Sequence, residues 1–303
     1  MPSTFHPGER AAQARAGVAD RADHVGRSIG STIPAVAARF LTERRMLVVG
    51  AADREGRLWA TALTGEPGFL RAADASTLAV AARPAPGDPL AEALAAPVEV
   101  GTIALDPANR RRMRLNGRAT PTADGFTVAA AQVYANCPKY IQRRTPASSP
   151  APPGGARATA GDRLSTGQQL AVSTADTFFV ASAGPDGRVD ASHRGGNPGF
   201  VQVLGPDRLR WPEYAGNAMY NTLGNLELDP SAGLLLPDWE TGGSLLLTGR
   251  AGVDWSDPKA PAVDYAVDRV VELAPVAALT WSAPEFSPVN PPVARPHHPI
   301  RPV

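Results

Sequence analysis

The segment DASHRGGNPGF at Asp190–Phe200 concentrates hydrogen-bonding side chains at the end of a strand-like run. Ser192, His193 and Arg194 are consecutive, and two glycines and Asn197 follow them. An arginine presents a planar set of donors that matches a phosphate group, and glycines let the backbone approach a flat ring closely. The segment is therefore a candidate site for a phosphorylated ligand. The alternative, which the residues leave equally open, is a polar barrel rim in which glycine and asparagine serve only turns.

A second polar segment, YAGNAMYNTLGN at Tyr214–Asn225, carries Asn217, Tyr220 and Asn221 where a loop leads into a helix. Amide side chains and backbone N–H groups at the start of a helix can bind the same anion. The chain contains neither a GxGxxG nor a GxxxxGK[ST] motif. Nothing in the sequence therefore supports a dinucleotide-binding fold or a phosphate-binding P-loop.

Both segments lie in one half of an internal repeat. VVGAADREGRLWATALTGEPGFL, starting at Val48, aligns with VASAGPDGRVDASHRGGNPGFV, starting at Val180, and the later landmarks NGRA and TGRA stay in register. Self-similarity of this kind indicates a duplication of one structural unit. At the positions of Ser192–Arg194 the first copy has the largely apolar Thr61–Leu63. Only the second copy is therefore expected to keep the ligand-binding residues.

Each copy is predicted to form a small antiparallel barrel of five or six short strands with a helix before it. The helices are expected over residues 34–45, with Pro34 in the first helical position, and over residues 166–176. A further helix, interrupted at Pro138, is predicted over Thr127–Arg144. The predicted fold class is therefore mainly β, with two tandem β-barrels and flanking helices.

Charge and composition exclude several classes of function. The net charge is +1, so no electrostatic argument favours nucleic acid or an anionic membrane as a partner. The apolar runs are strand-sized, which predicts no transmembrane helix, and the N-terminus lacks an apolar signal segment, so a cytoplasmic protein is expected. The single cysteine, Cys137, permits no internal disulfide or cysteine-rich metal site and is expected to be a buried thiol. The five histidines show no metal-binding spacing, so no metal site is predicted.

The motifs TADTFFVAS, DASHRGGNPGF, WPEYAGNAMYNTLGN, PDWETG and LTGRA together resemble the pyridoxamine 5′-phosphate oxidase-like, FMN-binding split-barrel superfamily. The likeness is greatest to its two-barrel branch, which also carries VYANCPKYIQRR, and it extends from Phe5 to Trp281. The resemblance implies a degenerate N-terminal split barrel over 1–144, a linker over 145–162, an FMN-binding split barrel over 163–282 and a proline-rich tail over 283–303.

The resemblance also implies which residues would hold FMN between the barrels. One set lies on the strand expected beside the isoalloxazine: Ala191, Ser192, His193 and Arg194. A second set lies in the segment expected to hold the ribityl phosphate: Asn217, Met219, Tyr220 and Asn221. Trp239 stands where relatives place an aromatic ring near the flavin. A third set would reach the flavin or the substrate entrance, or would form only a basic cluster at a helix C-terminus: Lys139, Tyr140 and Gln142.

These expectations favour an FMN-dependent oxidoreductase that acts on an unidentified small molecule, with one flavin per chain. His193 and Arg194 are the predicted catalytic residues, because they would stabilise charge that develops on the flavin or on bound substrate. Electrons would come from a separate donor such as NAD(P)H or a reductase, and a homodimer is compatible with this arrangement. The alternative is a non-catalytic flavin- or haem-binding protein of the same fold.

Overall fold

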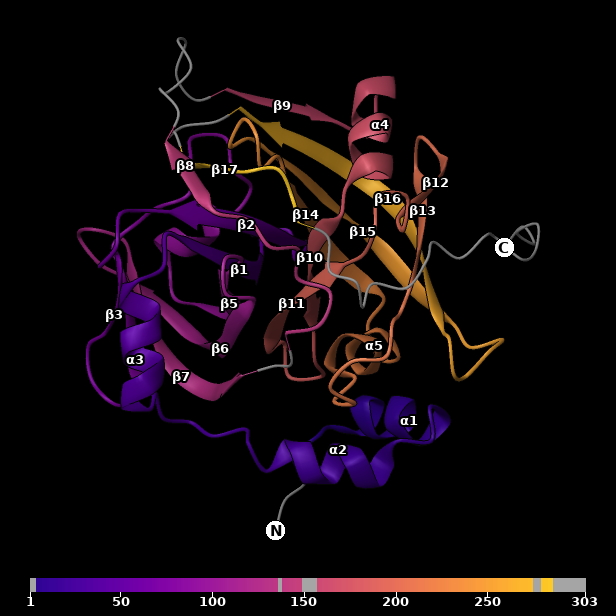
Figure 1. Ribbon diagram of the computed structural model, residues 1–303, viewed down its shortest axis with the longest axis horizontal. Helices are drawn as coiled ribbons and strands as arrows, with labels where there is room; N and C mark the ends of the chain where they lie inside the picture. The colour runs from indigo at the N-terminus through magenta and orange to yellow at the C-terminus, as the bar shows by residue number, and fades with distance from the viewer. Residues whose placement is uncertain (1–3, 136–137, 149–156, 275–278, 286–303) are drawn as a thin grey trace.

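The computed structural model describes residues 4–135, 138–148, 157–274 and 279–285 and shows two β-barrels side by side (Figure 1). The strands of the first barrel are β1 (Met46–Ala52), β2 (Leu58–Thr64), β3 (Leu70–Ala72), β4 (Thr77–Val80), β5 (Val98–Asp106), β6 (Arg111–Pro121) and β7 (Phe126–Ala135). Those of the second barrel are β10 (Thr177–Ala183), β11 (Val189–Gly195), β12 (Gln202–Gly205), β13 (Arg208–Pro212), β14 (Ser231–Pro237), β15 (Ser244–Asp254) and β16 (Ala262–Leu273).

The two barrels have the same strand order. The first sheet runs β2-β1-β5-β6-β7-β4-β3 and the second runs β11-β10-β14-β15-β16-β13-β12, with every neighbouring pair antiparallel. Each position in one sheet has its counterpart at the same place in the other. The predicted duplication and the mainly β, two-barrel fold are confirmed by this topology.

A β-bulge also recurs at equivalent places in the two barrels. The register of β6 against β7 shifts between Asn116 and Gly117, and that of β15 against β16 shifts between Thr248 and Gly249. A Cβ added at Gly117 would lie 1.9 Å from the Ala129 carbonyl oxygen, and the equivalent atom at Gly249 would be similarly blocked. Only glycine fits such a close approach, which explains why NGRA and TGRA stand out in the sequence.

The barrels pack against each other around an approximate twofold axis. Gly50 of β1 and Ala181 of β10 occupy equivalent positions, and a Cβ on Gly50 would lie 2.7 Å from the Ala181 Cβ. Gly101 of β5 would meet the backbone of β11 at 2.5 Å, and its counterpart Gly233 would meet Trp59 of β2 at 2.5 Å. Contact between a position and its own equivalent is the mark of an isologous interface, formed here within a single chain.

One buried apolar cluster crosses this interface. It includes Leu63 of the first barrel together with Phe179 and Leu246 of the second. Burying a side chain of this size contributes about 1.5–3 kcal/mol relative to leaving it in water. The two barrels therefore share a core, and their relative position is fixed by packing.

In the part of the chain that the structure describes, five helices and three short strands surround the barrels. The helices are α1 (Pro7–Arg15), α2 (Ala19–Gly26), α3 (Ala35–Thr42), α4 (Thr166–Thr174) and α5 (Asn221–Leu226), with a 3-10 turn, η1 (Ala93–Ala95). The strands are β8 (Pro146–Ser148), β9 (Ala158–Gly161) and β17 (Leu279–Trp281). The His6 side chain caps α1 by accepting from the backbone N–H of Gly8. Figure 1 shows α1 lying beside α5, so this N-terminal helix packs on the second copy although it precedes the first barrel in the sequence.

Several sequence predictions need correction. The predicted helix over Thr127–Arg144 is wrong, since residues up to Ala135 form β7, whose pairing with β6 overrides the helix preference of an alanine-rich segment. The predicted linker contains β8 and β9, of which β9 extends the second sheet beside β16. Pro34 is the N-cap of α3, one position before the expected one. Cys137 and most of the proline-rich tail lie outside the described residues. None of the helices in the described ranges is long and apolar enough to cross a membrane.

Candidate functional site

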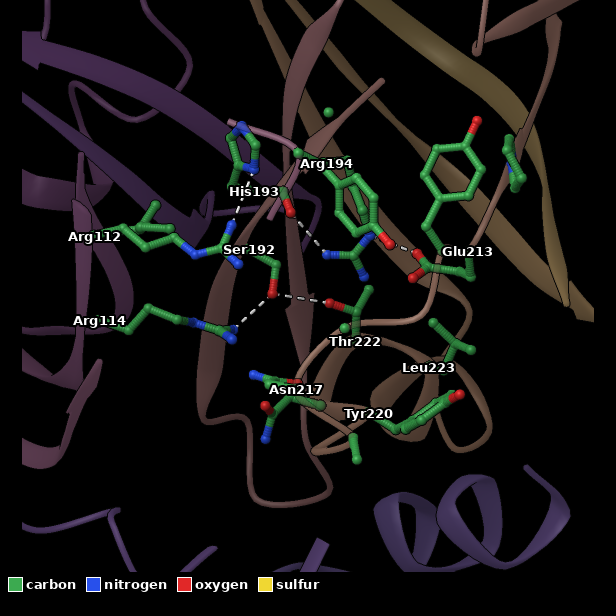
Figure 2. Close-up of a pocket in the computed structure, with 18 of the residues that line it drawn as sticks. Arg112, Arg114, Ser192, His193, Arg194, Glu213, Asn217, Tyr220, Thr222 and Leu223 are labelled. Carbon is green, nitrogen blue, oxygen red and sulfur yellow. Dashed lines mark hydrogen bonds and ion pairs between the residues drawn. The ribbon is translucent and has the colours of Figure 1, made fainter. Parts of the chain in front are cut away.

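A pocket opens where β11 and the loop before α5 face β5 and β6 of the first barrel (Figure 2). It holds about 820 Å³ of space between atoms, counting its open mouth. Its lining includes the predicted residues Ser192, His193, Arg194, Asn217, Tyr220, Asn221 and Tyr140. The structure therefore brings the two polar segments of the second copy together, as their residue types suggest.

The first barrel contributes two arginines to this pocket. Arg112 and Arg114 both lie on β6, two residues apart, so their side chains leave the same face of the strand. Figure 2 shows them entering from the side of the pocket opposite Glu213. The sequence analysis missed both residues. The sequence RRMR at 111–114 does indicate that Arg112 and Arg114 share one face of a strand. Only the packing of the two barrels shows that this face lines the pocket.

Arg114 reaches across the barrel interface into a buried polar network. It forms an ion pair with Asp190, and its guanidinium donates to the Ser192 hydroxyl at 2.7 Å. The Thr222 hydroxyl donates to the same Ser192 oxygen at 3.1 Å, and Asn116 donates to the Asp190 carboxylate at 2.9 Å. A charge-assisted network of this kind fixes the orientation of its members. Ser192 is thus held in place from both barrels.

His193 is a neutral imidazole whose tautomer is set by Arg112. Arg112 Nη1 lies 3.0 Å from His193 Nδ1, and because a guanidinium can only donate, Nδ1 accepts and Nε2 carries the proton. The ring is only 7% exposed. Burial, reinforced by the charges of Arg112, Arg194 and Arg144, lowers the pKa of His193 well below its usual range. Nε2 has no hydrogen-bond partner among the residues that the structure describes.

Arg194 and two tyrosines form the opposite wall. The Arg194 Nε donates to Glu213 at 2.5 Å, which holds the guanidinium beside the pocket. The rings of Tyr140 and Tyr214 lie 5.2 Å apart between centroids, and the Tyr140 hydroxyl donates to the Ala215 carbonyl at 2.8 Å. The buried Tyr214 hydroxyl, like His193 Nε2, has no partner within the described ranges. Buried polar groups are rarely left unsatisfied unless a ligand or water completes them.

The loop before α5 has an unusual backbone. Ala218 and Tyr220 in this loop line the pocket with φ values of 66° and 59°, in the left-handed region that favours glycine. Tyr140, which lines the pocket from the segment after β7, has a φ of 67°. Each such residue costs about 1–3 kcal/mol and persists only where the surroundings impose it. In this loop the Asn217 side chain accepts from the Met219 backbone N–H at 3.0 Å. The loop is therefore preorganised by local bonds.

Helix α1 braces this loop from behind. The Gln13 side chain donates to the Met219 carbonyl at 2.8 Å, and Asn221 donates to the Glu9 carboxylate at 2.5 Å. Burial raises the pKa of Glu9. The two helices approach closely at Gly224, where an added Cβ would lie 2.4 Å from the Glu9 Cα. Asn221, predicted to hold a phosphate, is thus already engaged by the N-terminal helix.

Five predicted residues do not line the pocket. Ala191 is buried against the first barrel, and Met219 packs into a separate small core cluster. Lys139 is exposed, and the buried Gln142 side chain donates to the Gly196 carbonyl at 2.7 Å. Trp239 packs edge-on against Trp281, with the Arg144 guanidinium 4.9 Å from its ring centroid. These residues surround the site or support it from a distance.

The twofold-related position is filled with apolar side chains from both barrels. Leu63 occupies the position equivalent to Arg194, and Leu246 that equivalent to Arg114, and both are fully buried. Thr61, the counterpart of Ser192, donates to the buried Asp88 carboxylate. Among the described residues of this second position, the cations of the pocket are replaced by core packing. Of the two twofold-related positions in the described part of the chain, one is therefore a polar pocket and the other is filled.

Comparisons with known proteins give the following result. No protein-family model and no curated protein matches the chain. Solved structures that match include a putative pyridoxamine 5′-phosphate oxidase from Lactobacillus delbrueckii, at 17% identity and a TM-score of 0.30, covering 36% of this chain and 98% of its own. Another is an FAD-binding protein from Mesorhizobium loti, at 13% identity and a TM-score of 0.27, covering 39% of this chain and 98% of its own. A third is the haem storage protein HutZ from Vibrio cholerae, at 12% identity and a TM-score of 0.29, covering 38% of this chain and 97% of its own. The split-barrel assignment of this chain is carried by its own strand order.

Proposed function

We propose that the pocket binds FMN and that the protein is an FMN-dependent oxidoreductase acting on a small molecule. One observation carries the proposal: Arg112 and Arg114 of the first barrel converge with Ser192–Arg194 of the second on a single open pocket. Guanidinium groups suit a phosphate, and the tyrosine pair offers an apolar wall to a flat ring. The sequence resemblance to FMN-binding split barrels points in the same direction.

The residues fit this cofactor in three respects. The His193 Nε2–H and the Tyr214 hydroxyl are buried polar groups that await a partner, and a heteroaromatic ring has acceptors to offer them. Ala218 and Tyr220 hold the pocket loop in a left-handed backbone conformation that is costly for residues other than glycine, and such strain is common at ligand-binding sites. Arg112 and Arg114 both line the pocket, and the charge of Arg114 is balanced by Asp190. FMN is therefore compatible with the donors, the backbone and the charge of the pocket.

When bound, the flavin would supply the hydride or electron transfer, which no protein side chain provides. Arg112 and the loop at 216–221 would hold its phosphate, and Arg114, which is paired with Asp190, would keep Ser192 in place. His193, kept neutral by burial, would donate from Nε2 without adding positive charge. Glu213 keeps the Arg194 guanidinium in one orientation, so that it can stabilise negative charge on a bound substrate. Tyr140 and Tyr214 would exclude water from this side of the pocket.

The stoichiometry that follows is one FMN per chain, because Leu63 and Leu246 fill the twofold-related position. The electron donor would be NAD(P)H or a separate reductase. The haem-binding alternative is disfavoured by the tautomer of His193. An axial ligand needs an unprotonated nitrogen, yet Nδ1 accepts from Arg112 and Nε2 carries the proton.

The test compares the protein with two variants of one strand. FMN binding is measured by flavin fluorescence and calorimetry for the wild type, for Arg112→Gln, and for Arg118→Gln, an exposed control also on β6. We expect one FMN per chain, about tenfold weaker binding for Arg112→Gln, corresponding to about 1.4 kcal/mol, and no change for Arg118→Gln. Bleaching of the bound flavin by NAD(P)H would support the oxidoreductase. Protein that binds no FMN, or a Soret band on addition of haem, would contradict the proposal.

A further inference from the structure

A second cavity lies outside the site described above, on the outer side of the first barrel. It is bounded by the first turn of α3 and by the β5–β6 hairpin, and it holds about 1100 Å³ of space between atoms, counting its open mouth. Its apolar lining includes Phe40, Met113 and Val133, which are buried core residues. Val36, on the wall, is 67% exposed, so this apolar surface faces an open space.

Three consecutive arginines border this cavity. Arg110, Arg111 and Arg112 all line it, and among the described lining residues there is no aspartate or glutamate. The nearest acidic group on the hairpin, Asp106, forms an ion pair with the buried Arg44 at 2.7 Å. Because the Arg112 guanidinium is bonded to His193 in the first pocket, the relevant rim cation is Arg111, and no carboxylate stands beside it among the described lining residues.

The rim arginines are held in place by aromatic and backbone geometry. The Arg111 guanidinium lies 5.1 Å from the centroid of the Phe40 ring, at a cation–π distance. Arg110 has a φ of 52°, in the left-handed region that is costly for a residue with a side chain. The β5–β6 hairpin is therefore strained at Arg110, and the next residue, Arg111, lies over the apolar Phe40 ring.

Helix α3 adds a further feature that favours an anion. Its N-cap is Pro34, which makes no side-chain capping bond, and its first turn contains no acidic residue. The Ala37 N–H donates to the Pro34 carbonyl at 2.9 Å, so the amides of Ala35 and Val36 are the ones without a partner within the helix, and the helix dipole favours negative charge at this end. Pro34, Val36 and Ala37 line the cavity, so this uncapped end borders the same space as the arginines.

We propose that this cavity is a binding site for a small organic anion with an apolar body, such as an arylalkyl or medium-chain carboxylate. The apolar part would cover Val36 and Phe40, and the carboxylate would lie between Arg111 and the start of α3. Arg112 lines this cavity and also donates to His193 in the first pocket. Occupation of the cavity is therefore expected to change the affinity of the first pocket.

The experiment uses the full chain without added flavin, so that its result does not depend on the proposed cofactor. The probe is trifluoromethyl-phenylacetate, observed by fluorine NMR line broadening, with its methyl ester as the uncharged control. Val36→Asp places a carboxylate in the cavity wall at an exposed position, and Arg111→Gln removes one rim cation. Arg71→Gln, an exposed arginine on β3, is the matched control.

We expect the carboxylate to bind and the ester to bind at least fivefold more weakly. We expect Val36→Asp to abolish binding, Arg111→Gln to weaken it about fivefold, which corresponds to about 1 kcal/mol, and Arg71→Gln to leave it unchanged. Equal binding of acid and ester would overturn the anion site. Binding that survives both cavity variants, or no binding at millimolar probe, would overturn the cavity as the ligand's location. Circular dichroism of each variant confirms that it is folded.

Discussion

Arg114 of the first barrel and Asp190 of the second form a buried ion pair across the barrel interface. The carboxylate also accepts from Asn116, and the guanidinium also donates to Ser192. The ion pair therefore has three roles: it links the two barrels, it orients the Ser192 hydroxyl, and it places the Arg114 guanidinium beside the pocket. The relation was not visible in the sequence, because its partners are far apart along the chain.

Replacing Asp190 with asparagine should destabilise the protein by about 3–5 kcal/mol, because it leaves the Arg114 guanidinium buried without a counter-charge. The measurement is the free energy of unfolding from urea titration. The control is Arg118→Gln on β6, the strand that also carries Arg114. It breaks the exposed pair of Arg118 with Glu99 of β5 and should cost less than about 1 kcal/mol. Equal losses for the two variants would show that the buried pair has no special weight.

The buried His193 should make stability fall in mild acid. Its pKa is lowered in the folded state, so below about pH 6.5 the unfolded chain takes up a proton that the folded protein does not. The contribution is absent above that pH, and it destabilises the fold by up to about 1.4 kcal/mol for each pH unit below it. We expect His193→Gln to be less sensitive than the wild type between pH 7.5 and pH 5. Parallel stability curves would contradict this role.

Gly101→Ala should push the two barrels apart. The added Cβ would lie 2.5 Å from the backbone of Asp190 and Ala191, and no side-chain rotation can relieve a clash with backbone. We expect a loss of at least about 1–3 kcal/mol together with weaker FMN binding. Gly167→Ala, in α4 with nothing within 4 Å, is the control and should be neutral or slightly stabilising. An unchanged unfolding midpoint for Gly101→Ala would mean that the interface is looser than its packing indicates.

Substitutions of Trp239 and Tyr140 should differ in their effect on FMN affinity. Trp239 packs on Arg144 and Trp281, so Trp239→Phe should lower stability by about 1 kcal/mol and leave FMN affinity within twofold. Tyr140 lines the pocket beside Tyr214, so Tyr140→Ala should weaken FMN binding by about tenfold, or about 1.4 kcal/mol. Flavin fluorescence titration measures both. A larger loss of FMN affinity for Trp239→Phe than for Tyr140→Ala would instead support the position beside the flavin that the sequence resemblance implied for Trp239.

The duplication and most strands could be predicted because their signals are local: turn glycines, alternating side chains and landmarks that recur in register. The strand β7 could not, because its run of alanines favours a helix and only pairing with β6 decides otherwise. For the site, the residues of β11 and the loop before α5 stood out by type. Arg112 and Arg114 did not, since a basic residue on a strand signals nothing until the partner barrel is in place. The bracing of the loop by Glu9 and Gln13 was hidden for the same reason.

The contact of Gly50 with Ala181 at the approximate twofold axis has an evolutionary consequence. In a dimer of identical subunits, every substitution appears twice, so a change that improves one pocket alters the other as well. Joining the halves in one chain ends this constraint. One of the two equivalent interface positions is filled by Leu63 of the first barrel and Leu246 of the second and so gains core packing, while the other keeps the strained and polar residues that ligand binding demands. The fusion lets one interface position stabilise the fold and the other bind, and it softens the usual trade-off between stability and activity.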